Sequence, residues 1–257
     1  YDFVVNEAKF PQTQGTKITF VVQDAFNNKY GGPPVKVNAN CPAGSTACYR
    51  TFDELKTTWT TFMDDFMSSV IAKSITIDIY DIFSEPDWTW EGITNNQLFE
   101  LFKIAHNAIR QNKPAAKISA PAYTFYDRAF LESFLDYAAA NNLHLDGLAW
   151  HEFDLPDNPE AVVSHVDEMR RAINIRPELC NPTCPEIYIN EHIGPEHHLI
   201  PGWNVGWLYY LEKANVDQAL RACWDVKNKD FPFKEWSTCW NGFDGMLMED
   251  NIMTQHI

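Results

Sequence analysis

Basic residues are scarce in this 257-residue chain: 20 Lys and Arg stand against 35 Asp and Glu, and the formal net charge is −15. Nucleic-acid binding needs a positively charged surface, so this balance argues against a nucleic-acid partner and against an anionic membrane surface. No apolar run reaches the length of about 18 residues that a membrane-spanning helix needs. The charge suits a neutral substrate and favours solubility.

Two kinds of ligand-binding motif are also absent. No glycine-rich phosphate loop of the G-x-G-x-x-G or Walker type follows any expected strand, which argues against a nucleotide-binding open sheet. No C-x-x-C occurs, so a structural zinc site has little support. We therefore expect neither a metal ion nor another cofactor.

The cysteines form three close pairs along the sequence. An even number of cysteines in short connections favours disulfides over a zinc site, and disulfides persist in oxidising compartments. We therefore expect a secreted, extracellular protein. The predicted bridges are Cys41–Cys48, Cys180–Cys184 and Cys223–Cys239.

Apolar residues make up 45% of the chain and charged residues 21%, which is typical of a globular protein with a sizeable core. Apolar, β-branched runs recur with helical patterns between them, and this alternation indicates a parallel sheet with covered faces. Strands are expected to begin near residues 18, 75, 117, 146, 186 and 216. Helices are expected over about residues 51–71, 95–111, 127–140, 158–173 and 203–213.

This serial pattern predicts an α/β fold of the (β/α)₈ TIM-barrel type, in which active sites lie on the loops after the strands. Only six of the eight strands can be identified. We expect residues 1–257 to form a single catalytic-type barrel domain that is N-terminally incomplete and lacks its first two strands. Either the chain is part of a longer protein or the barrel itself is incomplete.

Two glutamates follow apolar runs at the ends of expected strands. Glu85 comes after the run that begins at Ile75, directly before a loop expected to start at Pro86. Glu191 follows Glu186–Ile189. About three strand-and-helix units separate them, so a barrel would place them on opposite walls of one mouth. Facing carboxylates can hydrolyse a glycosidic bond, one as a protonated acid and one as an ionised nucleophile. The alternative is that the two are unrelated surface carboxylates.

Several short segments resemble clan A glycoside hydrolases, and most closely glycoside hydrolase family 39 with its fungal and bacterial relatives. Phe83-Ser84-Glu85-Pro86 is similar to the Trp-Asn-Glu-Pro segment that follows strand 4 in that family. Further similar segments are 149–153, 189–191, 202–224 and 239–247. The resemblance spans roughly residues 18 to 250.

The resemblance implies a retaining, double-displacement hydrolase that acts on a poly- or oligosaccharide. Glu85 would be the acid/base and Glu191 the nucleophile. The expected substrate-binding residues are Ser84, Trp88, Trp90, His151, Asn190 and Trp224. A core position is the alternative for His151 and Trp224, and a loop anchor is the alternative for Trp88 and Trp90. The sequence defines neither the sugar and linkage nor the oligomeric state.

Two features qualify this reading. Ser84 stands where the family has an Asn that donates to the sugar 2-hydroxyl, and a serine is too short to reach as far. A catalytically impaired barrel that serves as a carbohydrate-binding or structural extracellular protein is therefore the alternative function. A cluster of metal-ligand types follows the nucleophile segment, although the clan's chemistry needs no metal: His192, Glu196, His197 and His198.

Overall fold

The structure is a computed structural model of the chain. It describes residues 17–23, 51–90, 92–153, 158–194 and 200–222, the single positions 15 and 197, and the pairs 225–226 and 236–237. The expected bridges Cys41–Cys48 and Cys223–Cys239 lie outside the described residues, as does Trp224. The expected bridge Cys180–Cys184 is present.

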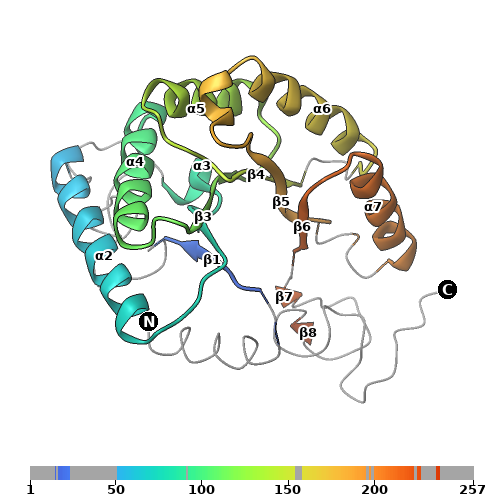
Figure 1. Cartoon of the computed structure of the whole chain (residues 1–257). Helices are drawn as coiled ribbons and strands as arrows, with labels where there is room; N and C mark the ends of the chain where they lie inside the picture. The colour runs from blue at the N-terminus through green and yellow to red at the C-terminus, as the bar shows by residue number, and fades with distance from the viewer. Residues whose placement is uncertain are drawn as a thin grey trace.

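A single sheet of six parallel strands forms the centre of the structure, and its strands lie side by side in chain order. The sheet curves into a half-barrel with helices along its outer side (Figure 1). The expected α/β architecture with six barrel strands is thereby confirmed. The strands are β1 (Thr19–Val22), β2 (Ile79–Ile82), β3 (Lys117–Tyr123), β4 (Gly147–Glu152), β5 (Glu186–His192) and β6 (Gln218–Arg221).

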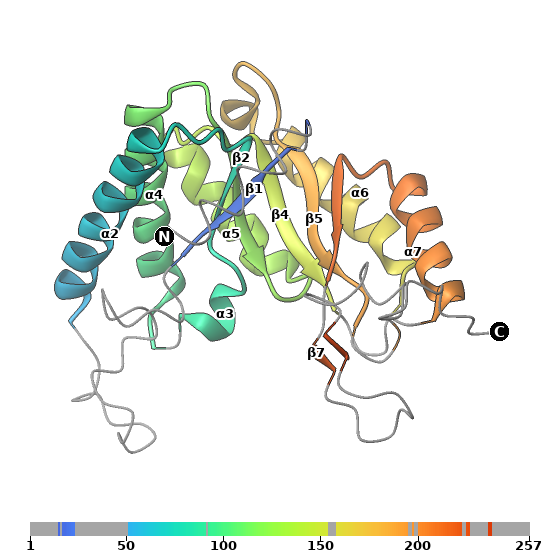
Figure 2. The ribbon, with the colours of Figure 1, turned by 90° about the horizontal axis from the view of Figure 1, so that it is seen from below.

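Five longer helices connect these strands and cover the convex face of the sheet (Figure 2). They are α2 (Phe52–Ala72), α4 (Asn95–Asn112), α5 (Arg128–Ala140), α6 (Ala161–Asn174) and α7 (Pro201–Lys213). The shorter elements are α3 (Pro86–Thr89), the 3₁₀ turn η2 (Pro177–Cys180), and an antiparallel pair, β7 (Asp225–Val226) and β8 (Trp236–Ser237). None of the helices in the described part of the chain combines the length and apolar character that crossing a bilayer requires.

Three of the five longer helices begin directly after a capping side chain, whereas α6, expected from about residue 158, begins only at Ala161 and its N-cap Glu160 makes no side-chain capping bond. Thr51 and Glu54 form a reciprocal capping box at the start of α2, and Thr94 and Gln97 form a second one at the start of α4. Each box satisfies backbone N–H groups that the first helical turn cannot pair internally. Asp127 caps α5 by accepting a 3.0 Å hydrogen bond from the N–H of Phe130.

Two separate apolar layers lie on the two faces of the sheet. The larger layer fills the space between the sheet and the helices and includes fully buried Phe102, Phe134 and Trp150. The smaller layer lines the concave face and consists of Ile79, Ala122, Ala149 and Tyr188. The small inner layer leaves the concave face open to polar side chains nearer the carboxyl ends of the strands.

An aspartate clasp recurs at the amino ends of the strands. Directly before β2, β4 and β6 the chain has an Asp. The backbone N–H of this Asp donates to the carbonyl of an Ile at the amino end of the neighbouring strand. Its carboxylate accepts from the N–H of the same Ile. Each clasp fixes the register of two neighbouring strands. The pairs are Asp78 with Ile18, Asp146 with Ile118 and Asp217 with Ile187.

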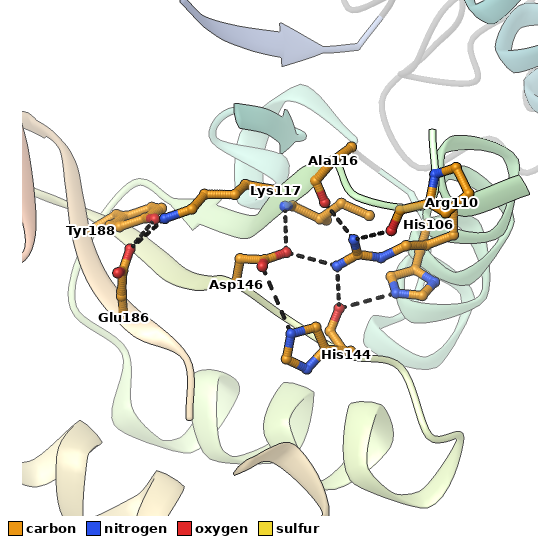
Figure 3. Close-up of polar contacts among 10 residues, drawn as sticks. His106, Arg110, Ala116, Lys117, His144, Asp146, Glu186 and Tyr188 are labelled. Atoms are coloured by element: carbon orange, nitrogen blue, oxygen red, sulfur yellow. Dashed lines mark hydrogen bonds and ion pairs between the residues drawn. The ribbon is translucent and has the colours of Figure 1, made fainter. Parts of the chain in front are cut away.

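The clasp at Asp146 belongs to a larger polar network (Figure 3). Arg110 donates to Asp146 Oδ2 at 2.7 Å and also to the backbone carbonyl oxygens of Pro114 and Ala116. The carbonyl oxygen of His144 lies within hydrogen-bond distance of this guanidinium, at 3.4 Å. The network ties the end of α4 to the starts of β3 and β4, at the opposite end of the strands from Glu85.

Two local expectations are wrong. The strand expected from Ile75 begins only at Ile79, because the buried residues Ile75 and Ile77 lead up to the strand without pairing in the sheet. Pro86, expected to begin a loop, instead opens the helical turn α3. Proline suits the first turn of a helix because its fixed φ is helical and its missing N–H would be unpaired there anyway.

Candidate active site

The two glutamates lie at the same rim of the half-barrel. Glu85 follows β2 and Glu191 is the next-to-last residue of β5, and both strands run in the same direction. In a parallel sheet the carboxyl ends of all strands meet at one edge, which is where barrel enzymes carry their active sites. The sequence-based pairing of these residues at one mouth therefore agrees with the fold.

The backbone of Glu85 is held in an unusual conformation. Its φ is 51° and its ψ is 54°, in the left-handed region. Its N–H donates to the carbonyl of Ala122 on β3 at 2.8 Å, and its own carbonyl accepts from the hydroxyl of Thr89 at 2.7 Å. These bonds anchor Glu85 between β3 and α3, so the position of its side chain is defined by the neighbouring strand and helix.

Glu191 owes its orientation to a β-bulge. Trp150 of β4 pairs with Ile189 of β5, whereas the next residue, His151, pairs with Glu191, so β5 carries one extra residue at Asn190. A bulge of this kind re-aims the side chains that follow it. It brings Asn190 and Glu191, which are sequence neighbours, into the same polar group as His151.

His151 lies between the two carboxylates. Its side chain is 1% exposed, and its Nδ1 is 3.3 Å from Glu85 Oε1. Its charge also acts on Glu191, whose pKa it lowers. The structure thus places His151 as a buried partner of Glu85.

The pKa of Glu191 is raised above the ordinary value. Burial is the largest cause, and the negative charge of Glu85 adds to it, whereas His151 acts in the opposite direction. Desolvation and a like charge both disfavour the ionised carboxylate. The two glutamates are therefore electrostatically coupled across the mouth.

A third carboxylate, Asp81, belongs to the same group and is absent from the sequence-based site. It is 2% exposed and accepts hydrogen bonds of 2.6 Å from both Ser119 Oγ and Asn190 Nδ2. Burial raises its pKa to about 6. A signal was available in the sequence, because Asp81 is the only charged residue in the apolar strand Ile79–Ile82.

Backbone strain is concentrated at this rim. Four residues without glycine's freedom have positive φ angles next to the site, and such conformations persist only where the surrounding structure enforces them. They follow or end three of the site strands. They are Phe83 (76°), Glu85 (51°), Ala122 (48°) and Ile193 (70°).

Ser84 lies beside a residue that the sequence did not single out. The backbone N–H of Ser84 donates to Gln23 Oε1 at 3.0 Å, and the Ser84 carbonyl accepts from the hydroxyl of Thr89 at 2.9 Å. Gln23 follows β1, so it adds a polar side chain to the rim from a fifth strand. Its chance of recognition from sequence was small, because a single Gln after a short strand has no distinguishing pattern.

The burial of Trp90 favours its structural alternative, a loop anchor. The indole is 2% exposed and packs edge-on against Trp59 and against Phe83, with ring centroids 5.3 and 5.1 Å away. It is therefore a core anchor of the segment after β2 and does not line an open subsite. The structure describes the backbone of Trp88 but not its side chain.

Two of the four residues of the His-rich cluster after Glu191, His192 and His197, lie within the described residues. His192 is buried against Trp207, and burial lowers its pKa to about 4. His197 lies against the ring of Trp203, with centroids 4.2 Å apart, and Glu196 and His198 are outside the described residues. No group of three or more His, Cys, Asp or Glu that could hold a metal ion is found in the described part of the chain.

Comparison with known proteins shows similarity of fold. No family model matches the chain, and no curated protein matches it. N2152 from Neocallimastix frontalis is similar with a TM-score of 0.64 at 21% identity, over 86% of this chain and 49% of that protein. A glucosidase from Croceicoccus marinus is similar with a TM-score of 0.63 at 16% identity, over 96% of this chain and 49% of the glucosidase. A GH39 enzyme from Xanthomonas axonopodis pv. citri is similar with a TM-score of 0.56 at 17% identity, over 77% of this chain and 43% of that enzyme.

This chain spans about half the length of the first two of these proteins. At such low identities the similarity concerns the fold: the six-stranded half-barrel matches part of the barrel of glycoside hydrolases.

Proposed function

We propose that this chain carries the catalytic pair of a secreted, retaining glycoside hydrolase of clan A, related most closely to family 39, that acts on a poly- or oligosaccharide. The observation that carries the proposal is the arrangement of Glu85 and Glu191 at the carboxyl ends of two strands, coupled to each other and to His151. The fold that the chain shares with glycoside hydrolases supports it.

In the first step of the proposed reaction, the Glu191 carboxylate attacks the anomeric carbon. The bond from that carbon to the leaving oxygen breaks, and Glu85 gives its proton to this oxygen. A glycosyl ester on Glu191 results. In the second step Glu85 removes a proton from a water molecule, which attacks the same carbon and releases Glu191. A structure with a bound sugar should place the two carboxyl groups about 5–5.5 Å apart.

His151 has a supporting role in this scheme. Its Nδ1 lies 3.3 Å from Glu85 Oε1 and holds that carboxyl group in place from the buried side of the site. Its charge also favours the ionised form of Glu191, against the effects of burial and of Glu85. It therefore assists both the acid and the nucleophile without needing to contact the sugar.

Substitution of each glutamate tests the proposal. Glu191→Gln should abolish turnover of every substrate, because no carboxylate remains to attack. Glu85→Gln should slow substrates with poor leaving groups by about 10²–10⁴-fold and activated aryl glycosides much less, because the latter leave without a proton. Azide should partly restore the Glu85→Gln variant and give a product of retained configuration. Equal activity of both variants and the wild type would show that the pair is not catalytic.

The same variants also test the assignment of roles. Burial raises the pKa of Glu191, which is the direction expected of a proton donor. If azide rescued Glu191→Gln with a product of retained configuration, and Glu85→Gln only with inversion, the acid and the nucleophile would be exchanged.

The alternative function is carbohydrate binding without catalysis, and Ser84 favours it. The family's Asn at the position of Ser84 donates to the sugar 2-hydroxyl, and the shorter serine cannot reach as far. At the preceding position the family has Trp, whereas Phe83 is buried and has no side-chain N–H. A panel of aryl glycosides and polysaccharides separates the two functions: measurable binding with no hydrolysis by the wild type would select this alternative.

A further inference from the structure

Asp81 forms a direct link between the strands of the two catalytic glutamates. These strands, β2 and β5, are separated in the sheet by β3 and β4, so no backbone hydrogen bond joins them. The side chain of Asp81 on β2 reaches across the concave face to Asn190 on β5, with 2.6 Å between Oδ2 and Nδ2. The other oxygen accepts from Ser119 on β3, also at 2.6 Å.

The residue that Asp81 contacts is the bulged one. Asn190 is the extra residue of β5 opposite the step from Trp150 to His151, so the pairing with β4 leaves it without a partner residue. A bulged residue needs side-chain contacts to fix its position, because the regular ladder is interrupted there. Asp81 supplies such a contact to Asn190, the residue that directly precedes Glu191.

The carboxylate also selects one orientation of the Asn190 amide. An ionised Asp accepts hydrogen bonds and cannot donate them, so it can pair only with the NH₂ end of the amide. The other end, Oδ1, is buried and has no hydrogen-bond partner in the described part of the chain. Asp81 thus determines which atom of Asn190 is left as a free acceptor.

We propose that Asp81 is a positioning residue for the nucleophile: by holding Asn190 in the β5 bulge, it aims Glu191 toward Glu85. This inference rests on the proposed glycosidase function, and Asp81 itself does not touch the reacting atoms. The charged groups that face Glu191 are Asp81 and Glu85 on or after β2 and His151 on β4.

The test compares Asp81→Asn and Asp81→Leu with Asp146→Asn. Asp146 is a matched control, because its carboxylate also bridges two strands and accepts a backbone N–H at 2.9 Å, but at the amino ends of the strands. Asp81→Leu should lower kcat about 10²-fold, the effect expected of a misplacement of about 1 Å. KM should change little, because an interaction needed only for attack is lost. Asp146→Asn should lower thermal stability and leave kcat unchanged.

A second measurement does not depend on turnover. The carboxyl carbon of Glu191, labelled with ¹³C and assigned by its absence in Glu191→Gln, can be titrated by NMR. Both Asp81 substitutions change the contact that holds Asn190, so the Glu191 midpoint and the Asn190 and Glu191 amide signals should move. Asp146→Asn should change neither. An unmoved midpoint and unmoved amides in both Asp81 variants would overturn the inference. If the Asp81 variants shift these signals but the wild type hydrolyses no substrate, the link from Asp81 to Glu191 is supported and the proposed glycosidase function is refuted.

Discussion

In the proposed mechanism the carboxyl group of Glu191 must be ionised before it can attack, and its burial makes ionisation harder. We therefore predict that the acid limb of the kcat/KM pH profile lies above the ordinary carboxyl pKa of 4.5. His151→Gln should move this limb further up, because it removes a group that lowers the pKa of Glu191. Initial rates across the pH range measure both effects. A limb at or below 4.5 in the wild type would contradict the prediction.

The buried Asp81 should make folding stability depend on pH. Its pKa rises from 3.8 to about 6 in the folded protein, so the folded state holds its proton more tightly than the unfolded chain. Stability from this group is therefore complete below about pH 4 and is lost as the pH rises through 6. At about 1.36 kcal/mol per pKa unit, the loss is about 3 kcal/mol.

The measurement is a difference between two proteins. Chemical unfolding of the wild type and of Asp81→Asn is followed from pH 4 to pH 7, and the pH-independent cost of the substitution cancels when the two profiles are subtracted. We expect the wild type to lose more stability than Asp81→Asn over this range. Parallel profiles would mean that Asp81 does not change its pKa on folding.

Ser84 offers a gain-of-function test of the proposed glycosidase. The backbone N–H of Ser84 already donates to Gln23 Oε1 and is not free to donate to a sugar. A donor for the sugar must therefore come from a side chain longer than that of serine. Ser84→Asn should raise kcat by about 10- to 100-fold, the equivalent of a hydrogen bond worth about 1.5–3 kcal/mol in the transition state. Ser84→Ala is the control and should change little. Steady-state kinetics on a 2-hydroxy and a 2-deoxy glycoside would locate the gain at the 2-hydroxyl.

At the scale of strands and helices, the packing of β4 against β5 predicts that Gly147 cannot be replaced by a larger residue without loss of stability. A Cβ on Gly147 would lie 2.3 Å from the ring of Tyr188, whose hydroxyl is held by Glu186 at 2.5 Å. Gly147→Ala should therefore destabilise the protein by about 1–3 kcal/mol through overpacking. The matched control is Gly206→Ala in α7, where the nearest atom is 3.9 Å away. This change should stabilise by about 0.5–1 kcal/mol, because alanine is the better helix former. Thermal unfolding of both variants should give shifts of opposite sign.

Most elements could be predicted because their signals are local. The capping pairs at Thr51 and Thr94 lie within one turn of the helices they begin, and the six strands are apolar runs with helical patterns between them. The bulge at Asn190 could not be predicted in this way, because it is defined by how β5 pairs with β4. The late start of β2 has the same cause, since Ile75 and Ile77 are as apolar as the strand but have no neighbour to pair with.

The candidate site divides along the same line. Glu85 and Glu191 were identifiable because each follows an apolar run, and parallel strands bring such positions to one edge. Trp90 stayed open between a subsite and a structural anchor, because an aromatic residue after a strand suits both, and its contacts with Trp59 favour the anchor. Asp81 was missed because its importance depends on a partner on β5, far along the sequence.

For the molecule as a whole, the curvature of the sheet is what creates the site. The strands β2 and β5 are three positions apart, and in a flat sheet their inner side chains could not share a hydrogen bond. The half-barrel bends them toward each other, as the bond between Asp81 and Asn190 demonstrates. The aspartate clasps lie at the amino ends of the strands and fix their register, whereas the candidate catalytic groups lie at the carboxyl ends.

The paired cysteines predict three disulfides in the whole chain, and disulfides persist in oxidising compartments. The bridge Cys180–Cys184 is observed, and 41–48 and 223–239 remain predictions. Reduction adds two hydrogens per bridge, so intact mass before and after reduction counts them, and peptide mapping without reduction assigns the pairs. Free thiols at these four positions would remove the support for an extracellular location.

Replacing Cys180 and Cys184 together by Ser should cost only about 2 kcal/mol, because the bridge spans 4 residues and closes a small loop. Opening the predicted 223–239 loop should cost about 1 kcal/mol more in the same chain-entropy description, because its loop is longer.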